Sequence, residues 1–254
     1  MPRRVIVSGA SSGIGARIAE DFGAAGDDVV LVARRRDRLD EVAAAVLKAG
    51  AASATAVEVD LTETADVLGA LTAAVATGPF DVVVAAAGGN AALDADAAAE
   101  RGGTAWAAWH WEGNFRANVL TAVNLVEGLR ELDGIARGAA ITLFSSIAAY
   151  RGSGSGSYAG SKAALHPYAY DLAGALGRTG ARVNVVAPGY IADTEFFRGQ
   201  MSQTRHETLT GQTLIGRAGT PEDVSATVQW LSSPAARHVT GQIIQVNGGA
   251  ALGH

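Results

Sequence analysis

The first fifteen residues contain the feature that most restricts the fold of this chain. A short apolar run at residues 4–7 leads into the glycine-rich stretch SGASSGIG at residues 8–15, and a helical pattern continues to Phe22. A strand, a glycine-rich turn and a helix N-terminus together form an anion site, because backbone N–H groups point outward and the helix dipole favours negative charge. A glycine-rich turn that binds no ligand would have a similar composition. The position of this turn, between a strand and a helix at the start of the chain, favours the binding of a dinucleotide pyrophosphate. The residues predicted to contact it are Gly9, Ser11, Ser12, Gly13, Ile14 and Gly15.

Apolar runs and helical patterns alternate through the rest of the chain. Further strands are expected at residues 29–32, 54–59, 81–86, 139–144, 182–187 and 242–246, with helical patterns between them. This alternation is typical of a doubly wound parallel sheet. We therefore predict an α/β fold: a single Rossmann-type domain over residues 1–254, with a mostly parallel sheet of about seven strands.

A basic cluster follows the second predicted strand. A dinucleotide fold that uses NAD has an acidic residue about 20 positions after the glycines, whereas an arginine there suits the 2′-phosphate of NADP. Arg34 stands 19 residues after Gly15. We assign Arg34 and Arg35 to the phosphate and interpret Arg36 and Arg38 as exposed charges that open the next helix.

Asp60 follows the third predicted strand. Its carboxylate is placed either to reach an adenine edge or to cap the helix that begins after Thr62. After the fourth strand, Gly88 and Gly89 allow the backbone to pass close to a cofactor.

Tyr158 and Lys162 are the candidate catalytic pair. They are four residues apart, so on a helix their side chains lie on one face. A nearby ammonium favours the phenolate and lowers the pKa of a tyrosine, which makes such a pair a plausible proton donor to a carbonyl that becomes an alkoxide. Two solvated neighbours on a helix would show the same spacing. Ser145 and Ser146 end the preceding strand, and either hydroxyl could bond the same oxygen.

Composition excludes several classes of protein. The sequence is 48% hydrophobic and 18% charged, which is ample for a buried core. Its net charge of -5, without a basic tract, gives no support for nucleic-acid binding. There is no cysteine, and no metal site is predicted. Because no apolar stretch reaches the length of a membrane span or a signal peptide, we expect a soluble cytoplasmic protein.

Two further segments are candidate substrate walls. Trp106, Trp109 and His110 share a helical face, which fits a substrate wall, a subunit contact or ordinary core packing. His110 has no visible orienting partner, which favours a structural role. The irregular segment at residues 190–215, with Phe196 and Phe197, follows a strand and is predicted to be a substrate lid.

In this order, the segments resemble the short-chain dehydrogenase/reductase family over nearly the whole chain. The residues that carry the resemblance are Gly9, Gly13 and Gly15 in GASSGIG, Asp60-Leu61, Asn118, Ser146, Tyr158 with Lys162, Pro188-Gly189 and the terminal GQIIQVNGG. Each motif is modest alone, whereas their order and spacing together are specific.

The resemblance implies roles for these residues. Tyr158 would be the general acid in reduction and the base in oxidation. Lys162 would lower the pKa of Tyr158 and hold the nicotinamide ribose, Ser146 would orient the substrate carbonyl, and Asn118 would hold a water in a proton relay. The further cofactor contacts that it implies are Asp60, Leu61, Ala87, Gly88, Pro188, Gly189, Ile191 and Thr194. The family also implies a homo-oligomer, a tetramer or a dimer, with residues 120–129 and the Trp230 helix as contact faces.

Three departures from the family pattern stand out. Ala85-Ala86-Ala87-Gly88 replaces a motif with two asparagines, which removes hydrogen bonds that normally brace the sheet. Tyr158 follows Ser146 by 12 residues, one fewer than is common, so Ser145 stays an alternative for the serine role. Thr194 stands six residues after Pro188 instead of five, which leaves its contact with the nicotinamide amide open.

The main hypothesis is an NADP-dependent oxidoreductase that transfers a hydride between NADPH and a ketone or secondary alcohol. One alternative is a 3-oxoacyl-[acyl-carrier-protein] reductase, and another is a non-catalytic dinucleotide-binding regulator. A smallish, largely apolar ketone is favoured over an acyl carrier protein. A reductase that docks an acidic carrier needs a basic rim, and only Arg130, Arg137 and Arg178 were candidates for one.

Overall fold

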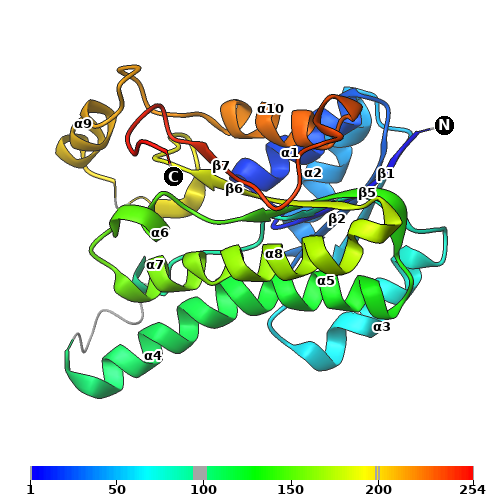
Figure 1. The fold of residues 1–254 in the computed structure, drawn as a ribbon, viewed down its shortest axis with the longest axis horizontal. Helices are drawn as coiled ribbons and strands as arrows, with labels where there is room; N and C mark the ends of the chain where they lie inside the picture. Colours follow the sequence, from blue (N-terminus) through cyan, green and yellow to red (C-terminus); the bar gives the residue numbers. More distant parts are fainter. Residues whose placement is uncertain (1, 94–101, 198, 200, 254) are drawn as a thin grey trace.

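The protein is built on one seven-stranded sheet in which all neighbouring strands are parallel (Figure 1). The computed structural model describes residues 2–93, 102–197, 199 and 201–253. The strands, which confirm the predicted fold class, are β1 (Arg4–Ser8), β2 (Asp28–Ala33), β3 (Ser53–Glu58), β4 (Phe80–Ala85), β5 (Ile135–Phe144), β6 (Arg182–Pro188) and β7 (Ile243–Val246). Their order across the sheet is β3-β2-β1-β4-β5-β6-β7.

Helices connect the strands and cover both faces of the sheet. They are α1 (Gly13–Ala24), α2 (Arg36–Ala49), α3 (Thr64–Val75), α4 (Gly103–Phe115), α5 (Thr121–Glu131), α6 (Ala148–Arg151), α7 (Gly156–Ala163), α8 (Leu165–Leu176), α9 (Gln203–Gly211) and α10 (Pro221–Leu231). A π-helical stretch, η3 (Arg116–Leu120), joins α4 to α5. Short 3-10 turns include η1 (Ala91–Leu93) and η5 (Glu195–Phe197). In the ranges that the structure describes, no helix combines the length and apolar character that a membrane span requires.

Two separate cores lie on the two faces of the sheet. Successive strand residues point to opposite faces, so Ile6 packs in one core while Val5 and Val7 pack in the other. The first core is shared with α3, α5 and α8, which lie below the sheet in Figure 1, and the second with α1, α2 and α10. This burial on both faces explains why the strands read as continuous apolar runs.

The α5 region differs from the sequence-based expectation. Residues 120–129 were predicted to form a contact face between subunits, but Leu125, Val126 and Leu129 are fully buried in the core. The helical spacing of these apolar residues therefore reflects their packing against the sheet of the same chain. The Trp230 side of α10 remains exposed, with 42% of Trp230 accessible.

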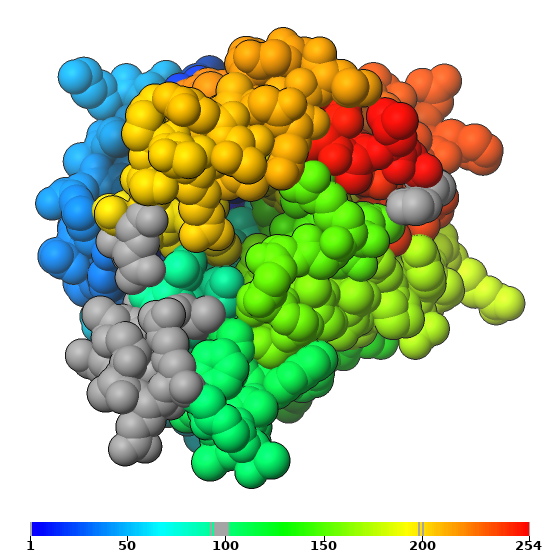
Figure 2. Space-filling model, turned by 90° about the vertical axis from the view of Figure 1, so that its left-hand side faces the viewer, coloured from blue at the N-terminus to red at the C-terminus, as the bar shows by residue number. Residues whose placement is uncertain are grey.

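The strand order reverses direction at β1, which pairs with β2 on one side and β4 on the other. At such a switch point the loops after the two strands leave on opposite faces of the sheet. They open a crevice at the carboxyl edge, where open α/β sheets bind their ligands. Figure 2 shows a hollow on this side of the molecule, between the yellow segment after β6 and the light-green α6 and α7.

Candidate active site

The glycine-rich turn runs from β1 into α1 at the switch point. Gly9 and Gly13 have positive φ angles of 68° and 54°, which side-chain-bearing residues rarely adopt. A Cβ on Gly15 would lie 2.3 Å from the carbonyl oxygen of Gly9, so the start of α1 packs directly on the turn. The turn therefore needs glycine for its own geometry, and it exposes the N-terminus of a twelve-residue helix to the cleft.

A cleft of about 1,720 Å³ extends from this turn along the carboxyl edge of the sheet. It is larger than the 300–1,000 Å³ that is typical for a site holding one small ligand. All the residues predicted to contact the cofactor line it: Gly9, Ser11, Ser12, Gly13, Ile14, Gly15, Arg34, Arg35, Asp60, Leu61, Ala87, Gly88, Tyr158, Lys162, Pro188, Gly189, Ile191 and Thr194.

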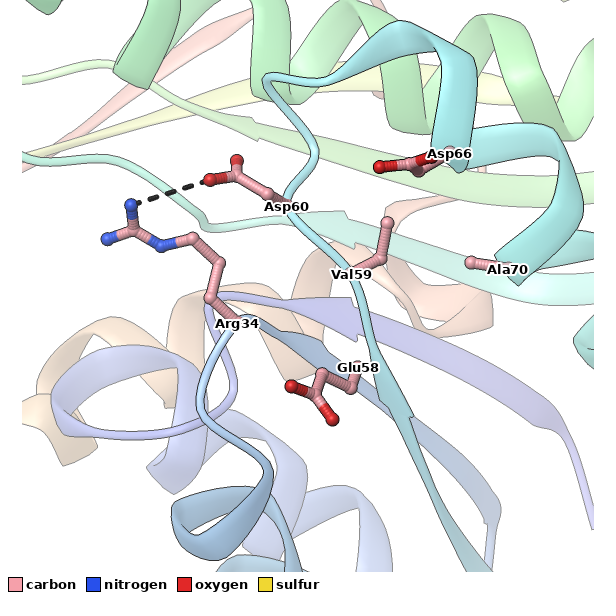
Figure 3. A pocket seen from close by; sticks show the side chains of 6 residues that line it. All are labelled: Arg34, Glu58, Val59, Asp60, Asp66 and Ala70. Carbon is pink, nitrogen blue, oxygen red and sulfur yellow. Dashed lines mark ion pairs between the residues drawn. The ribbon is translucent and has the colours of Figure 1, made fainter.

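Arg34 extends across the end of β3 toward Asp60, with 3.6 Å between a guanidinium nitrogen and a carboxylate oxygen (Figure 3). Asp60 also accepts hydrogen bonds from the backbone N–H and the hydroxyl of Thr62, at 2.9 and 2.8 Å. Burial opposes ionisation of Asp60, but these hydrogen bonds and the Arg34 charge outweigh it and lower the pKa of the carboxyl. Asp60 thus bonds Thr62 and does not cap α3, whose N-cap is Glu63 without a side-chain capping bond. The capping alternative is therefore wrong, and the Asp60 side chain lines the cleft.

Arg35 turns in the other direction, toward the glycine-rich turn. Its guanidinium lies 3.2 Å from the Ser11 hydroxyl and 3.4 Å from the Ser12 hydroxyl. The same group forms an ion pair with Glu195, from η5, at 3.2 Å. The two predicted phosphate ligands therefore flank the end of β2, Arg34 on the β3 side and Arg35 on the β1 side.

Tyr158 is buried on α7, where its hydroxyl forms a hydrogen bond with the Ser146 side chain. Burial raises the pKa of Tyr158 to about 12, opposed by that hydrogen bond. The expectation that Lys162 would lower the pKa of this phenol is not met in the protein alone, because burial dominates. The phenol is therefore protonated at neutral pH.

Lys162 lies on the same face of α7, buried at the end of β5. Its ammonium donates to the carbonyl oxygen of Phe144 at 2.9 Å, and burial lowers the pKa of Lys162 to about 8. A Cβ on Gly88 would lie 2.9 Å from the Lys162 nitrogen and 2.7 Å from Asn118 Oδ1. A side chain at Gly88 would therefore displace the side chains of Lys162 and Asn118.

Asn118 differs from the other predicted site residues, because it lies behind the cleft wall and is fully buried. Its Oδ1 accepts from the Gly89 N–H at 3.0 Å, and its Nδ2 donates to the Gly89 carbonyl at 2.9 Å and to Ser161 Oγ at 3.0 Å. Its side chain is thus a clamp between the loop after β4 and α7. It sits within the π-helical η3, a distortion that is often found at functional sites.

Asn114, one turn earlier, forms a second clamp that the sequence did not reveal. It accepts from the Ala91 N–H at 3.1 Å and donates to Ser157 Oγ at 2.9 Å. Ser8 Oγ also accepts from the Ala87 N–H at 3.2 Å. These bonds brace the loop after β4, where this chain lacks the two asparagines of the family pattern.

Ser145 and Ser146 have separate positions. Ser145 Oγ is buried, 2.9 Å from the Lys162 carbonyl and 2.8 Å from His166 Nε2, so its partners lie in the α7–α8 segment. The Ser146 side chain instead bonds Tyr158 and also accepts from the Ala148 N–H at 3.1 Å. This geometry favours Ser146 over Ser145 as the serine that orients a substrate.

The tryptophan cluster is partly core and partly wall. Trp106 and Trp109 lie against the His110 ring, with centroid separations of 4.8 and 6.3 Å. His110 is buried beside Ser157, and burial lowers its pKa, which agrees with a structural role. Trp109 lines the cleft, as the wall interpretation predicted.

The predicted lid includes two residues, 198 and 200, that lie outside the described ranges. Phe196, from η5, lies against Tyr158 with ring centroids 5.8 Å apart. The Thr194 methyl stands 3.6 Å from the position of a Cβ on Gly13, so Thr194 faces the glycine-rich turn. Part of the segment thus covers the cleft from the turn to the candidate proton donor.

These residues fit a nicotinamide dinucleotide. The turn presents glycine backbone and a helix N-terminus to a pyrophosphate, arginines lie where the adenosine ribose would follow, and Tyr158 lies at the other end of the cleft.

Comparison with known proteins agrees with this geometry. Residues 9–251 match the family model described as Enoyl-(Acyl carrier protein) reductase. The chain is 32% identical over 253 residues to galactitol 2-dehydrogenase (L-tagatose-forming) of Cereibacter sphaeroides, covering 96% of this chain and 92% of that protein.

Solved structures extend the likeness to the fold. A short-chain dehydrogenase/reductase of Brucella melitensis, titled glucose/ribitol dehydrogenase, superposes with a TM-score of 0.85 at 30% identity, covering 99% of this chain and 97% of that chain. A blue fluorescent protein from a metagenomic library, in complex with NADPH, gives a TM-score of 0.83 at 26% identity and 98% coverage of both chains. The chain belongs to the short-chain dehydrogenase/reductase family.

Proposed function

We propose that the protein is an NADP-dependent oxidoreductase that interconverts a ketone and a secondary alcohol. The observation that carries this proposal is the meeting of Tyr158, Ser146 and Lys162 in the cleft that begins at the glycine-rich turn. When bound, the nicotinamide supplies or accepts the hydride, so the work left to the protein is positioning and proton transfer.

The proton transfer is assigned to Tyr158. A phenol with a pKa of about 12 holds its proton at neutral pH and donates it readily to an alkoxide, which is far more basic. Ser146, bonded to the same hydroxyl, is the second donor to the carbonyl oxygen. The Lys162 ammonium adds positive charge that stabilises the anion formed at this oxygen. With Tyr158 protonated and Lys162 charged, the protein without a ligand has the protonation states that reduction of a ketone requires.

The choice of NADP rests on Arg34 and Arg35. Charge-assisted hydrogen bonds from arginine to phosphate are among the stronger ones. Arg35 is the better positioned of the two, since its bonds to Ser11 and Ser12 hold it beside the turn that would bind the pyrophosphate. The similar blue fluorescent protein, titled as a complex with NADPH, supports the same choice.

The test is to compare kcat/KM with NADPH and NADH in wild type and in Arg34→Asp, Arg35→Asp and Arg36→Asp. We expect wild type to prefer NADPH, and each of the first two substitutions to lower that preference about tenfold or more. Arg36, which pairs with Asp40 on the surface of α2, is the matched control and should not change it. Equal use of both cofactors by wild type would contradict the assignment.

For the substrate we propose a small ketone or its secondary alcohol. The related galactitol 2-dehydrogenase is named for such an interconversion. We also propose a homo-oligomer, tetramer or dimer, for which exposed aromatic residues such as Trp111, Phe115 and Trp230 offer apolar surface. A monomer in sedimentation at micromolar concentration would contradict that part.

A further inference from the structure

The starting point is an ion pair between two segments far apart in the chain. Glu195, the first residue of η5, lies 3.2 Å from the guanidinium of Arg35 through one carboxylate oxygen. Its other oxygen lies 3.2 Å from the guanidinium of Arg38. One carboxylate from the segment after β6 thus bridges two arginines at the start of α2.

The same Arg35 nitrogen that meets Glu195 also approaches the hydroxyls of Ser11 and Ser12. These serines belong to the glycine-rich turn, and all four residues line the cleft. The Glu195 carboxylate therefore lies beside the place where the adenosine ribose would follow the pyrophosphate. It holds the guanidinium that is proposed to receive the 2′-phosphate.

Neighbouring arginines have carboxylate partners of their own. Arg34 pairs with Asp60, Arg36 with Asp40, and Arg38 with Glu41 as well as Glu195. Among the described residues, Glu195 is the one carboxylate paired with Arg35. A phosphate that binds Arg35 therefore meets this particular carboxylate.

We propose that Glu195 sets the cofactor selectivity of the enzyme by competing with the ribose 2′-phosphate for Arg35. A phosphate dianion at Arg35 must displace or share the Glu195 ion pair, and it is repelled by the carboxylate at short range. A nucleotide without the 2′-phosphate brings no charge to this position. The carboxylate therefore weakens the binding of NADP more than the binding of NAD, and it reduces the difference in affinity between the two cofactors.

The effect should be moderate, because the groups are half exposed. The side chains of Glu195 and Arg35 are 51% and 47% accessible, so solvent and salt screen the interaction. Two exposed ion pairs and one phosphate–carboxylate repulsion together predict a change in affinity of about threefold to tenfold. The inference rests on the proposed NADP assignment, so the experiment must separate the two.

The experiment measures nucleotide binding by titration calorimetry, without turnover. The probes are adenosine 2′,5′-bisphosphate and adenosine 5′-monophosphate, which differ only in the 2′-phosphate. The proteins are wild type, Glu195→Gln and the control Glu41→Gln, which removes a carboxylate that pairs with Arg38 but not with Arg35. We expect Glu195→Gln to bind the bisphosphate about threefold to tenfold more tightly at low salt, and the monophosphate about equally. Glu41→Gln should change the affinity for either probe by no more than about twofold.

A double-mutant cycle identifies Arg35 as the shared partner. In an Arg35→Ala background, Glu195→Gln should tighten bisphosphate binding less than it does in wild type, because the competition for the guanidinium is gone and only the charge repulsion remains. Unchanged or weaker bisphosphate binding by Glu195→Gln would overturn the proposal. So would weaker monophosphate binding, which would mean that Glu195 holds the ribose hydroxyls.

The same experiment tests the NADP assignment separately, through the affinities of the wild-type protein for the two probes. If wild-type protein bound the two probes equally, the 2′-phosphate assignment would fail. The proposal about Glu195 is judged on the ratio of variant to wild type for the bisphosphate.

Discussion

The Lys162 ammonium donates a hydrogen bond to the backbone carbonyl of Phe144, 2.9 Å away, inside the protein. Phe144 is the last residue of β5, directly before the two serines. A carbonyl dipole compensates a buried cation only partly, since the charge has lost most of its hydration. The structure therefore keeps a charged side chain where burial opposes it, beside the candidate proton donor.

Replacing Lys162 by methionine should stabilise the protein at pH 7. The folded pKa of about 8 lies below the unfolded value, so between these values the unfolded chain binds more protons and stability rises with pH. Below pH 8 the whole penalty is present, on the order of 3 kcal/mol at most. Urea unfolding should show a gain for Lys162→Met at pH 7 that shrinks by pH 10, and none for the exposed control Lys48→Met. A variant less stable than wild type at pH 7 would refute this.

The same pKa predicts the pH profile of reduction. As pH rises through about 8, Lys162 loses its proton and the positive charge near the reacting oxygen disappears, while Tyr158 stays protonated. We expect kcat/KM for ketone reduction to fall above pH 8. Lys162→Arg, if active, should move the fall to higher pH, because arginine stays charged. A profile that stays level up to pH 10 would rule out this role for the ammonium.

Changing Tyr158 to phenylalanine should abolish turnover and spare cofactor binding. It removes one hydroxyl that is needed during proton transfer, so kcat should fall about a hundredfold to ten-thousandfold. The dissociation constant for NADPH, measured by fluorescence, should change little. Tyr170→Phe, on the exposed side of α8, is the control. A near-normal kcat in Tyr158→Phe would contradict the assignment of proton transfer to Tyr158.

Ser146 and Ser145 should respond differently to alanine. Ser146 bonds Tyr158, so Ser146→Ala should lower kcat by about a hundredfold. Its cost in stability should be small, about 0.5–1 kcal/mol, from the lost bond to the Ala148 N–H. Ser145→Ala leaves the Lys162 carbonyl and His166 without a buried partner, which should cost about 1–3 kcal/mol of stability. The reverse pattern would make Ser145 the serine of the site.

The sequence predicted the features that local patterns determine. All seven strands were expected from apolar runs. The pattern is clearest in the inner strands β1, β2, β4 and β6, which are mostly buried on both faces, whereas the edge strands β3 and β7 are only partly buried. The glycine-rich turn was predicted because its geometry admits no other residue at Gly9 and Gly15.

Local sequence patterns did not predict the contacts between distant segments. The clamp made by Asn114 joins residues 23 and 43 positions away, and no local signal distinguishes that asparagine from a solvated one. The pairing of Glu195 with Arg35 spans 160 residues. The raised pKa of Tyr158 could not be foreseen either, since burial depends on the assembled core.

The structure also changes the argument about carrier proteins. Arg137 lies near the start of β5, and Arg130 and Arg178 precede β5 and β6, so all three stand toward the amino edge of the sheet. The cleft opens at the opposite, carboxyl edge. These arginines cannot form a docking rim at the mouth of the site. Besides Arg34 and Arg35, the arginines that line the cleft are Arg116, Arg151 and Arg205.

We therefore predict that a small, largely apolar ketone is a better substrate than a 3-oxoacyl carrier protein. These three arginines make a weak basic rim for an acidic partner, because each already has a contact within the chain. Arg116 pairs with Glu63, Arg151 bonds the Gln212 side chain, and Arg205 lies over the Phe197 ring. Phe196, against Tyr158, gives the reacting end of the cleft an apolar wall. The measurement compares kcat/KM for a panel of aliphatic and aromatic ketones with that for a 3-oxoacyl carrier protein. A carrier substrate favoured by orders of magnitude, and weakened selectively by Arg151→Glu or Arg205→Glu, would overturn the prediction, because only docking of an acidic protein at this rim would produce both results.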